Sequence, residues 1–379
     1  MRATEPGAIA PHVSEDHAEA DRLMTICNSC RYCEGLCAVF PAMEMRRAFA
    51  DGDLDYLANL CHGCGACFYD CQFSPPHEFN VNVPLVLARV RARSYASYAW
   101  PRAFRAVFAR NGLAVVLCLA LSVAAFLMGF ALLVDPAALF GIHAGPGGFY
   151  EVMPHSVMVV LFGGAFLYAL LALAFSARRF WCDIGEKERA LGNPPSLRQA
   201  IRDALGLRYL EGGGVGCMNE EERPTDRRRF YHHLTFYGFL ACFAATSVAT
   251  LYHYVLEREA PYPVYDLPVI LGTLGGLGLT FGPAGLLVAR WRREPVIADD
   301  ERFGMDVAFI AMLLLSGATG LALLALRATS LMGLALALHL AVVFALFITL
   351  PYGKFVHGIY RFLALLRYAR ERRILNRHA

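Results

Sequence analysis

Two stretches near the beginning of the chain repeat one cysteine pattern: CNSCRYCEGLC (Cys27–Cys37) and CHGCGACFYDC (Cys61–Cys71). Both have the spacing Cys-x2-Cys-x2-Cys-x3-Cys, and together they use eight of the twelve cysteines. Three closely spaced cysteines on a tight loop can supply three thiolate corners of a [4Fe–4S] cluster, and the fourth corner must come from elsewhere. The doubled pattern therefore predicts a domain that holds two [4Fe–4S] clusters.

In two-cluster proteins with this spacing, the last cysteine of each pattern ligates the other cluster. The expected ligands of the first cluster are Cys27, Cys30, Cys33 and Cys71, and those of the second are Cys61, Cys64, Cys67 and Cys37. This crossing would tie the two halves of the domain into one unit. The chain departs from many such sequences in carrying Ala38 and Gln72 where a proline is common.

Two other uses of these cysteines explain the pattern less well. A disulfide framework needs an oxidising compartment, and the chain opens with MRATEP rather than with an apolar export segment. Structural zinc sites would be satisfied by two Cys-x2-Cys pairs and would not need a third and a fourth cysteine at repeated offsets. Iron–sulfur clusters account for all eight residues.

The composition indicates a membrane protein. The 379 residues are 57% hydrophobic and 18% charged, which is more apolar than the roughly 45–50% of a soluble domain. The formal net charge of +3 gives no support to nucleic-acid binding. Six apolar runs approach or exceed the roughly 20 residues that cross a lipid bilayer and show almost no polar face. These predicted transmembrane spans are 112–134, 155–177, 232–255, 266–289, 305–326 and 331–350.

The predicted fold is an all-α membrane protein. It begins with a mobile N-terminus (1–21), continues as a helical two-[4Fe–4S] ferredoxin-like domain (22–100) and ends as a six-helix transmembrane domain (101–379). Apolar residues between the cysteine patterns recur at helical intervals around an expected turn at Asp51–Asp53. The fourth span is rich in glycine, so it could be broken or partly re-entrant.

Lysine and arginine placement predicts the orientation in the membrane. These residues concentrate before the first span, in the connectors 178–231 and 290–302, and in the tail, whereas the opposite loops hold only Arg258 and Arg327. Cytoplasmic loops carry the excess of basic residues. We therefore expect a protein of the cytoplasmic (inner) membrane with both termini and the cluster domain in the cytoplasm.

Histidines in and beside the spans are candidate haem ligands, because a polar side chain in hydrocarbon is costly unless it binds a cofactor or forms a hydrogen bond. The third span has His232 and His233 at its cytoplasmic end and His253 at the other end. The sixth span contains His339, and His357 follows eighteen residues later, which is five helical turns. The two would share a helix face if the helix continues through Pro351.

The third and sixth spans run in opposite directions, so His253 should meet the depth of His339. His357 should then meet either His232 or His233. Paired imidazoles fill both axial positions of a b-type haem, and this arrangement predicts one or two haems. Alternatively, the end histidines are interfacial and His339 hydrogen-bonds a neighbouring helix. His155, at the outer end of the second span, is interpreted as interfacial.

Other features suggest weaker interpretations. The glycines of 272–285 could make room for a porphyrin, but small residues are also typical of close helix packing. The run Gly212–Gly216 lacks the Walker lysine and the GxGxxG spacing, so we interpret it as a flexible linker. Arg227–Arg229 is a topology signal or a docking surface for an acidic partner. Four cysteines are isolated in the sequence: Cys118, Cys182, Cys217 and Cys242.

The sequence shows no nucleophile–base pair, dinucleotide fingerprint or flavin motif, so we assign no catalytic residue. It predicts a carrier that passes electrons from a cytoplasmic donor through two clusters and haem to a quinone in the bilayer, and that does not transform a substrate alone.

The two cysteine stretches, the sequences AVFP and QFSPPHEF that follow them, and the six spans resemble the tricarballylate utilization protein B family, also called citrate utilization protein B. The cluster domain is similar to the helical ferredoxin parts of succinate dehydrogenase and heterodisulfide reductase. The resemblance implies a soluble FAD-dependent partner that oxidises tricarballylate to cis-aconitate. It also implies that the membrane protein reoxidises the reduced FAD and delivers electrons to the quinone pool.

Other functions remain open from the sequence. A relative fused to its flavoprotein acts in cobalamin biosynthesis, which suggests a different electron-transfer role. A membrane redox sensor or docking anchor could carry the same cofactors without turnover, and a reversed flow would take electrons from quinol to a soluble acceptor. Quinone-dependent oxidation of a partner flavoprotein would distinguish a carrier from a sensor.

Overall fold

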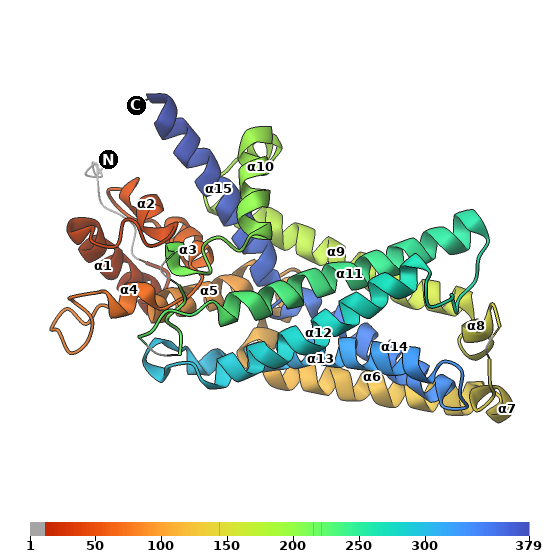
Figure 1. Ribbon diagram of the computed structural model, residues 1–379. Coiled ribbons are helices and arrows are strands. Elements are labelled where there is room, and N and C mark those ends of the chain that lie inside the picture. The colour runs from red at the N-terminus through yellow and green to blue at the C-terminus, as the bar shows by residue number, and fades with distance from the viewer. Residues whose placement is uncertain (1–11, 144, 215, 221, 379) are drawn as a thin grey trace.

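The computed structural model describes residues 12–378 apart from 144, 215 and 221. Helices form nearly all the regular structure of this part of the chain, which contains no strand and only an isolated β-bridge between Cys217 and Thr225. Short helices gather at one end of the molecule, and long helices run away from them (Figure 1). The predicted all-α architecture is confirmed.

Within the described residues, six helices are long and apolar enough to cross a membrane, which confirms the six predicted spans. They are α6 (Asn111–Leu133), α9 (His155–Asp183), α11 (Arg227–Leu256), α12 (Leu267–Trp291), α13 (Phe303–Leu326) and α14 (Met332–Thr349). Helix α12 is continuous although it contains Pro283. The glycines of this helix serve close packing, because a Cβ atom on Gly275 would lie 2.6 Å from the sulfur of Cys242 on α11.

The short helices before the spans contain the cysteine patterns. They are α1 (Glu15–Cys30), α2 (Val39–Glu44), α3 (Asp51–Leu60), α4 (Ala66–Tyr69) and α5 (Val83–Tyr98). Ser14 caps α1 by accepting a hydrogen bond from the backbone N–H of His17 at 3.3 Å. Helix α1 thus begins inside the segment 1–21 for which the sequence predicts mobility, and residues 1–11 lie outside the described residues.

The expected turn at Asp51–Asp53 is wrong, since these residues form the first turn of α3. Acidic side chains are favourable there because the amino end of a helix carries partial positive charge. The Asp-Gly-Asp composition that suggests a turn is equally suited to a helix start.

The C-terminal helix α15 (Val356–His378) returns to the short helices and packs against them (Figure 1). Leu365 and Leu366 of α15 are buried in one hydrophobic core with Tyr56 of α3 and Trp181 of α9. The core of the N-terminal domain is therefore completed by residues from the far end of the chain.

The condition under which His339 and His357 would share a helix face, a helix that continues through Pro351, is not met. Helix α14 ends at Thr349, a 3-10 turn covers Leu350–Tyr352, and α15 begins at Val356. Pro351 causes the break, because proline lacks the N–H and clashes with the preceding helical turn. The five-turn argument for a shared helix face therefore fails.

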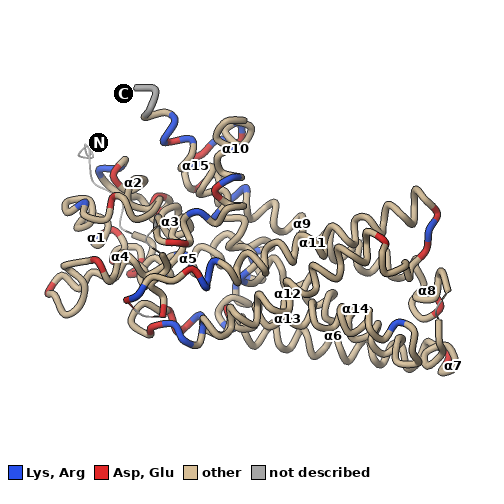
Figure 2. The backbone as a smooth tube through the Cα atoms, viewed as in Figure 1, with Lys and Arg blue, Asp and Glu red and all other residues tan. Residues whose placement is uncertain are grey.

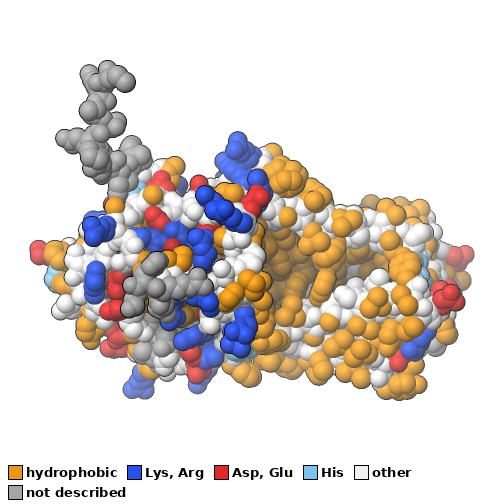
Figure 3. Space-filling model, turned by 90° about the horizontal axis from the view of Figure 1, so that it is seen from above, with side chains coloured by type: hydrophobic (Ala, Val, Ile, Leu, Met, Phe, Trp, Pro, Cys, Tyr) orange, Lys and Arg blue, Asp and Glu red, His pale blue; other side chains and the backbone are white. Residues whose placement is uncertain are grey.

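Charge and apolar surface separate along the molecule. Lysines and arginines gather at the end formed by α1–α5 and α15 (Figure 2). Hydrophobic side chains cover the half formed by the long helices on the face shown in Figure 3. The far end carries the short helices α7 (Pro136–Leu139) and α8 (Gly148–Val152). This distribution is typical of a bundle embedded in a bilayer with one polar domain outside it.

Candidate functional site: two cysteine-lined cavities and a histidine pair

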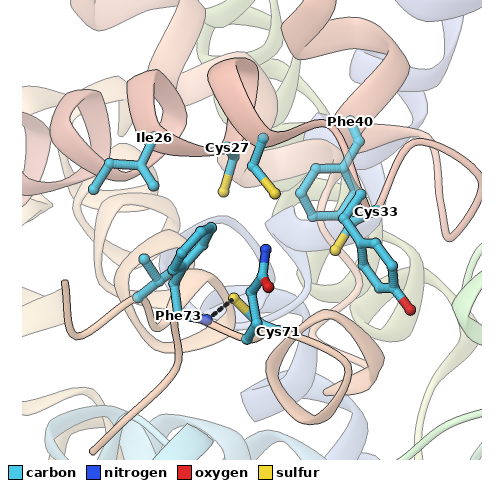
Figure 4. Close-up of a pocket in the computed structure, with 10 residues that line it drawn as sticks. Ile26, Cys27, Cys33, Phe40, Cys71 and Phe73 are labelled. Atoms are coloured by element: carbon cyan, nitrogen blue, oxygen red, sulfur yellow. Dashed lines mark hydrogen bonds between the residues drawn. The ribbon is translucent and has the colours of Figure 1, made fainter. Parts of the chain in front are cut away.

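The first cavity, with about 370 Å³ of empty space including its opening, is lined by the thiols of Cys27, Cys30, Cys33 and Cys71. Cys27 and Cys30 lie in the last turn of α1, and Arg31 then adopts a left-handed conformation with φ of 57°. This turn reverses the chain so that Cys33 faces the same space, with Cys27, Cys33 and Cys71 directed toward one another (Figure 4). The Phe73 N–H donates to the Cys71 sulfur at 3.4 Å.

The second cavity, with about 380 Å³ of empty space, is lined by Cys37, Cys61, Cys64 and Cys67. Cys61 follows α3, Cys67 lies in α4, and the Gly63 N–H between them donates to the Cys61 sulfur at 3.3 Å. Phe40 lines both cavities, so the cavities are neighbours. The structure brings together the same two crossed sets of four cysteines that the spacing predicts.

The donor chemistry of both cavities fits iron–sulfur clusters. All twelve cysteines are free thiols. Burial, together with the nearby thiols, raises the pKa of Cys27 to about 12, and burial raises the pKa of Cys64 to about 12. A thiol with so high a pKa is deprotonated only when a bound cation, such as the iron of a cluster, stabilises the thiolate. No group of three or more His, Cys, Asp or Glu in the described residues closes on a single metal ion, and the thiols surround wider spaces.

Four arginines surround the outer side of the loop Cys61–Cys64. Arg91 of α5 donates to the Cys61 carbonyl at 2.7 Å, and Arg361 of α15 donates to the same oxygen at 2.8 Å. Arg228 of α11 donates to the carbonyls of His62 and Gly63 at 3.2 and 3.0 Å. The fourth, Arg293, lies 3.5 Å from the position that a Cβ atom on Gly63 would occupy.

Gly212, the first residue of the run interpreted as a flexible linker after α10 (Pro194–Leu205), lies against this loop. A Cβ atom on Gly212 would lie 3.4 Å from the Cys64 sulfur, and Gly212 has a φ of +61°. Cys217, isolated in the sequence, is buried beside the second cavity, where its thiol lies 3.5 Å from the Cys64 carbonyl. The Met218 N–H donates to the same carbonyl at 2.8 Å.

His232 of α11 and His357 of α15 form a pair at the polar end of the long helices. Their ring centroids are 6.2 Å apart. The structure thus places His232 beside His357, whereas His233 packs near Tyr237 with ring centroids 5.8 Å apart. The Nδ1 atom of His232 is buried without a hydrogen-bond partner among the described residues. Nδ1 of His357 donates to the Lys354 carbonyl at 2.5 Å, which leaves Nε2 of His357 as the lone-pair nitrogen.

This histidine pair fits axial ligation of iron. Two rings that each place a nitrogen about 2 Å from one metal have centroids about 6 Å apart. A hydrogen bond from the other ring nitrogen to a carbonyl orients a ligating histidine, as it does for His357. The orphaned Nδ1 of His232 gives this ring a free nitrogen as well.

Each histidine of the pair lies one helical turn from an arginine that holds the second cavity. On α11, Arg228 precedes His232 by four residues, and on α15, Arg361 follows His357 by four. Residues four apart share a helix face. The cavity loop and the histidine pair are therefore adjacent sites on the same two helices.

The predicted pairing of His253 with His339 is not what the structure shows. His253 stacks on His155 of α9, with ring centroids 3.8 Å apart, so His155 has a partner that the sequence analysis missed. This spacing leaves no room for iron between two ligating nitrogens. His339 instead lies within hydrogen-bonding distance of Thr319 on α13, 3.0 Å from Nδ1 to Oγ1, as the alternative of a helix-to-helix hydrogen bond predicts.

Comparisons with known proteins agree with this organisation. Residues 20–97 match the Citrate utilization protein B Fer4-like domain, and residues 108–378 match Citrate utilization protein B. A curated Citrate utilization protein B from Escherichia coli is 48% identical over 367 residues, which cover 95% of this chain and 94% of that relative. No solved structure matches the chain. The chain belongs to the citrate utilization protein B family.

Proposed function

We propose that this protein carries electrons from the reduced FAD of a soluble dehydrogenase to the quinone pool of the cytoplasmic membrane, through two [4Fe–4S] clusters and one b-type haem. The observation that carries the proposal is that three sites are neighbours. Phe40 lines both cavities, and the helices that hold the second cavity through Arg228 and Arg361 also carry the histidine pair. The partner in this proposal is a tricarballylate dehydrogenase-like flavoprotein, and the relative's name, Citrate utilization protein B, supports a role in the use of a tricarboxylate.

The first cavity is the entry point for electrons. Cys27, Cys30, Cys33 and Cys71 would hold the first cluster, and Cys30 is exposed. Tyr32 lines this cavity and is 73% exposed. A partner flavoprotein that docks over this exposed surface would bring its flavin close to the first cluster.

The second cavity and the histidine pair continue the route toward the bilayer. Cys37, Cys61, Cys64 and Cys67 would hold the second cluster, and His232 and His357 would hold the haem. Iron with two axial imidazoles has no open position, so it transfers electrons rather than binding oxygen. Arg228 and Arg361 hold the loop of the second cavity, and they lie on the same helices as His232 and His357. The two helices therefore fix the second cavity and the histidine pair relative to each other.

The charge distribution supports a cytoplasmic location for the cluster domain. Lysines and arginines gather at the end of the molecule that carries both cavities (Figure 2). Basic residues are retained on the cytoplasmic side of inner-membrane proteins. A cytoplasmic domain also meets the reducing conditions that keep cluster thiols from forming disulfides.

The first test is the cofactor content of protein purified anaerobically from membranes. We expect about eight iron atoms in clusters per chain, reduced-cluster EPR signals, and one b haem in the reduced-minus-oxidised spectrum with pyridine haemochrome quantitation. A preparation with both clusters and no haem would overturn the haem assignment, and one without clusters would overturn the whole proposal.

The second test is flux. Membranes containing the protein should oxidise a reduced partner flavoprotein when a quinone is added, and the Cys64→Ser variant should not. The exposed Cys182 of α9 provides the matched control, since Cys182→Ser should retain full activity. Reduction of the cofactors without sustained quinone-dependent turnover would instead indicate a redox sensor.

A further inference from the structure

We infer that the arginines Arg91, Arg228, Arg293 and Arg361 make the cluster of the second cavity the easier of the two to reduce, and so set the order in which the clusters hold an electron. This inference rests on the proposed function, because it requires both clusters to be present. It concerns four residues that hold no iron themselves.

The four guanidinium groups converge on a short backbone loop from four different helices or connectors. Arg91 and Arg361 share the Cys61 carbonyl, and Arg228 takes the next two carbonyls. Arg293 lies beside Gly63 but donates to the Ile297 carbonyl, 2.9 Å away. Arg91 is buried, and the other three are partly buried.

In the described part of the chain, none of these four arginines forms a salt bridge with a carboxylate. The hydrogen bonds of the four arginines go to backbone carbonyls and to the Cys217 sulfur. Asp306 acts electrostatically on Arg91 and Arg293, but its own salt bridges go to Arg290 and Lys354, so its charge is already shared. Gathering cations away from water costs free energy unless an anion repays it. A cluster with four thiolate ligands is such an anion.

The arginines also orient the loop toward the cluster. Because the carbonyls of Cys61, His62 and Gly63 point out to guanidinium groups, the peptide N–H groups can point inward. The Gly63 N–H donates to the Cys61 sulfur in this way. Hydrogen bonds to cluster sulfurs and nearby positive charge both stabilise the reduced state, which carries one more negative charge.

The first cavity lacks this group of arginines. Its lining is apolar or uncharged apart from the thiols, and Phe73 donates one N–H to the Cys71 sulfur. The charge difference therefore favours an electron in the second cavity, next to the histidine pair.

Arg293→Gln tests the inference most directly, because Arg293 makes no hydrogen bond to the loop and its loss changes charge more than geometry. In the purified holoprotein, a redox titration followed by EPR should show the second cluster reduced before the first in the parent protein. Arg293→Gln should move the midpoint of the second cluster to lower potential and leave that of the first unchanged. Arg293→Lys should keep the second midpoint at its parent value. Arg292→Gln, which changes the exposed neighbouring arginine, should shift neither midpoint.

Arg91→Gln is the second variant, and it should lower the same midpoint while Arg91→Lys retains it. The signals are assigned with Cys30→Ser and Cys64→Ser. Two assembled clusters with a second midpoint that neither Arg→Gln variant shifts would overturn the inference, as would a first cluster that is reduced before the second. Both results leave the proposed function intact, whereas failure of that function appears as missing clusters or missing quinone-dependent flux.

Discussion

His232 and His357 belong to helices separated by three other membrane-spanning helices in the sequence, yet their rings lie 6.2 Å apart at the polar end of the bundle. Their neighbours Arg228 and Arg361, one turn away on the same helices, hold the loop of the second cavity. This relationship connects a membrane site to a cysteine site through two helix turns, and it gives the first prediction.

His232→Ala should abolish haem binding while both clusters remain, because the substitution removes one of two axial nitrogens. The matched control is His233→Ala, which changes the adjacent residue on the same helix end but leaves the pair intact. Pyridine haemochrome content and iron content per chain measure the two cofactors separately. Equal haem content in His232→Ala and His233→Ala would show that this pair does not hold the haem.

Each cavity should lose its cluster independently of the other. Cys30→Ser removes a sulfur of the first cavity and Cys64→Ser removes one of the second, so each variant should lose one cluster EPR signal and retain a substantial part of the other. If the pairing were within each sequence pattern rather than crossed, Cys71→Ser would resemble Cys64→Ser. We expect it to resemble Cys30→Ser.

Gly212→Ala should weaken the second cluster selectively. The new Cβ would meet Ala66 at 3.3 Å and the Cys64 sulfur at 3.4 Å, at a residue whose φ of +61° also disfavours a side chain. The left-handed conformation alone costs about 1–2 kcal/mol. Gly185→Ala controls for this strain, because Gly185 has a φ of +83° with nothing within 4 Å. We expect loss of the second cluster signal in Gly212→Ala and retention of both signals in Gly185→Ala.

Thr319→Val should leave haem content unchanged and destabilise the bundle modestly. It removes the hydrogen bond to His339 between α13 and α14, and such bonds in membranes are worth about 0.6 kcal/mol on average. Thermal unfolding in detergent would measure the loss, and the visible spectrum would measure the haem. A loss of haem in this variant would mean that His339 has a role in ligation that its contact with Thr319 does not explain.

Removal of iron should loosen the short helices more than the long ones. The thiols of both cavities are held together by α1, α3 and α4 and by the loops between them. Metal binding free energy contributes directly to the folding of such sites. Hydrogen exchange after anaerobic chelation should therefore increase in residues 27–71, with little change in α12 and α13, and uniform exchange across both regions would contradict this expectation.

The sequence predicts the helical fold and the crossed cysteine sets because both depend on short-range patterns. Twenty apolar residues indicate a span, and a repeated spacing indicates a site, wherever the chain goes next. The pairing of His253 with His339 fails for a physical reason. Depth in the bilayer follows from position along a helix, but the neighbour of a side chain depends on which helices pack together, and α14 turns His339 toward α13.

The arginines around the second cavity could be found only in part from the sequence. Arg91, Arg228, Arg293 and Arg361 come from four distant segments, and basic residues beside spans are expected for topology alone. The four-residue spacings Arg228–His232 and His357–Arg361 are the one short-range pattern that points to them. Gly212 and Cys217 carry no such pattern, because their role depends on how the connector folds back over Cys64.

The two cavities also differ in when the growing chain can complete them. Every residue that lines the first cavity lies between Ile26 and Val81. The second needs Tyr209 for its lining and receives its last arginine from position 361, after all six spans have been made. During synthesis from the amino end, the cysteines of both cavities are all present once Cys71 has been made, whereas the contact of Arg361 with the Cys61 carbonyl forms only when α15 folds back. The full set of arginine contacts around the second cavity therefore requires that the chain has passed through all six spans and that α15 has packed back on the short helices.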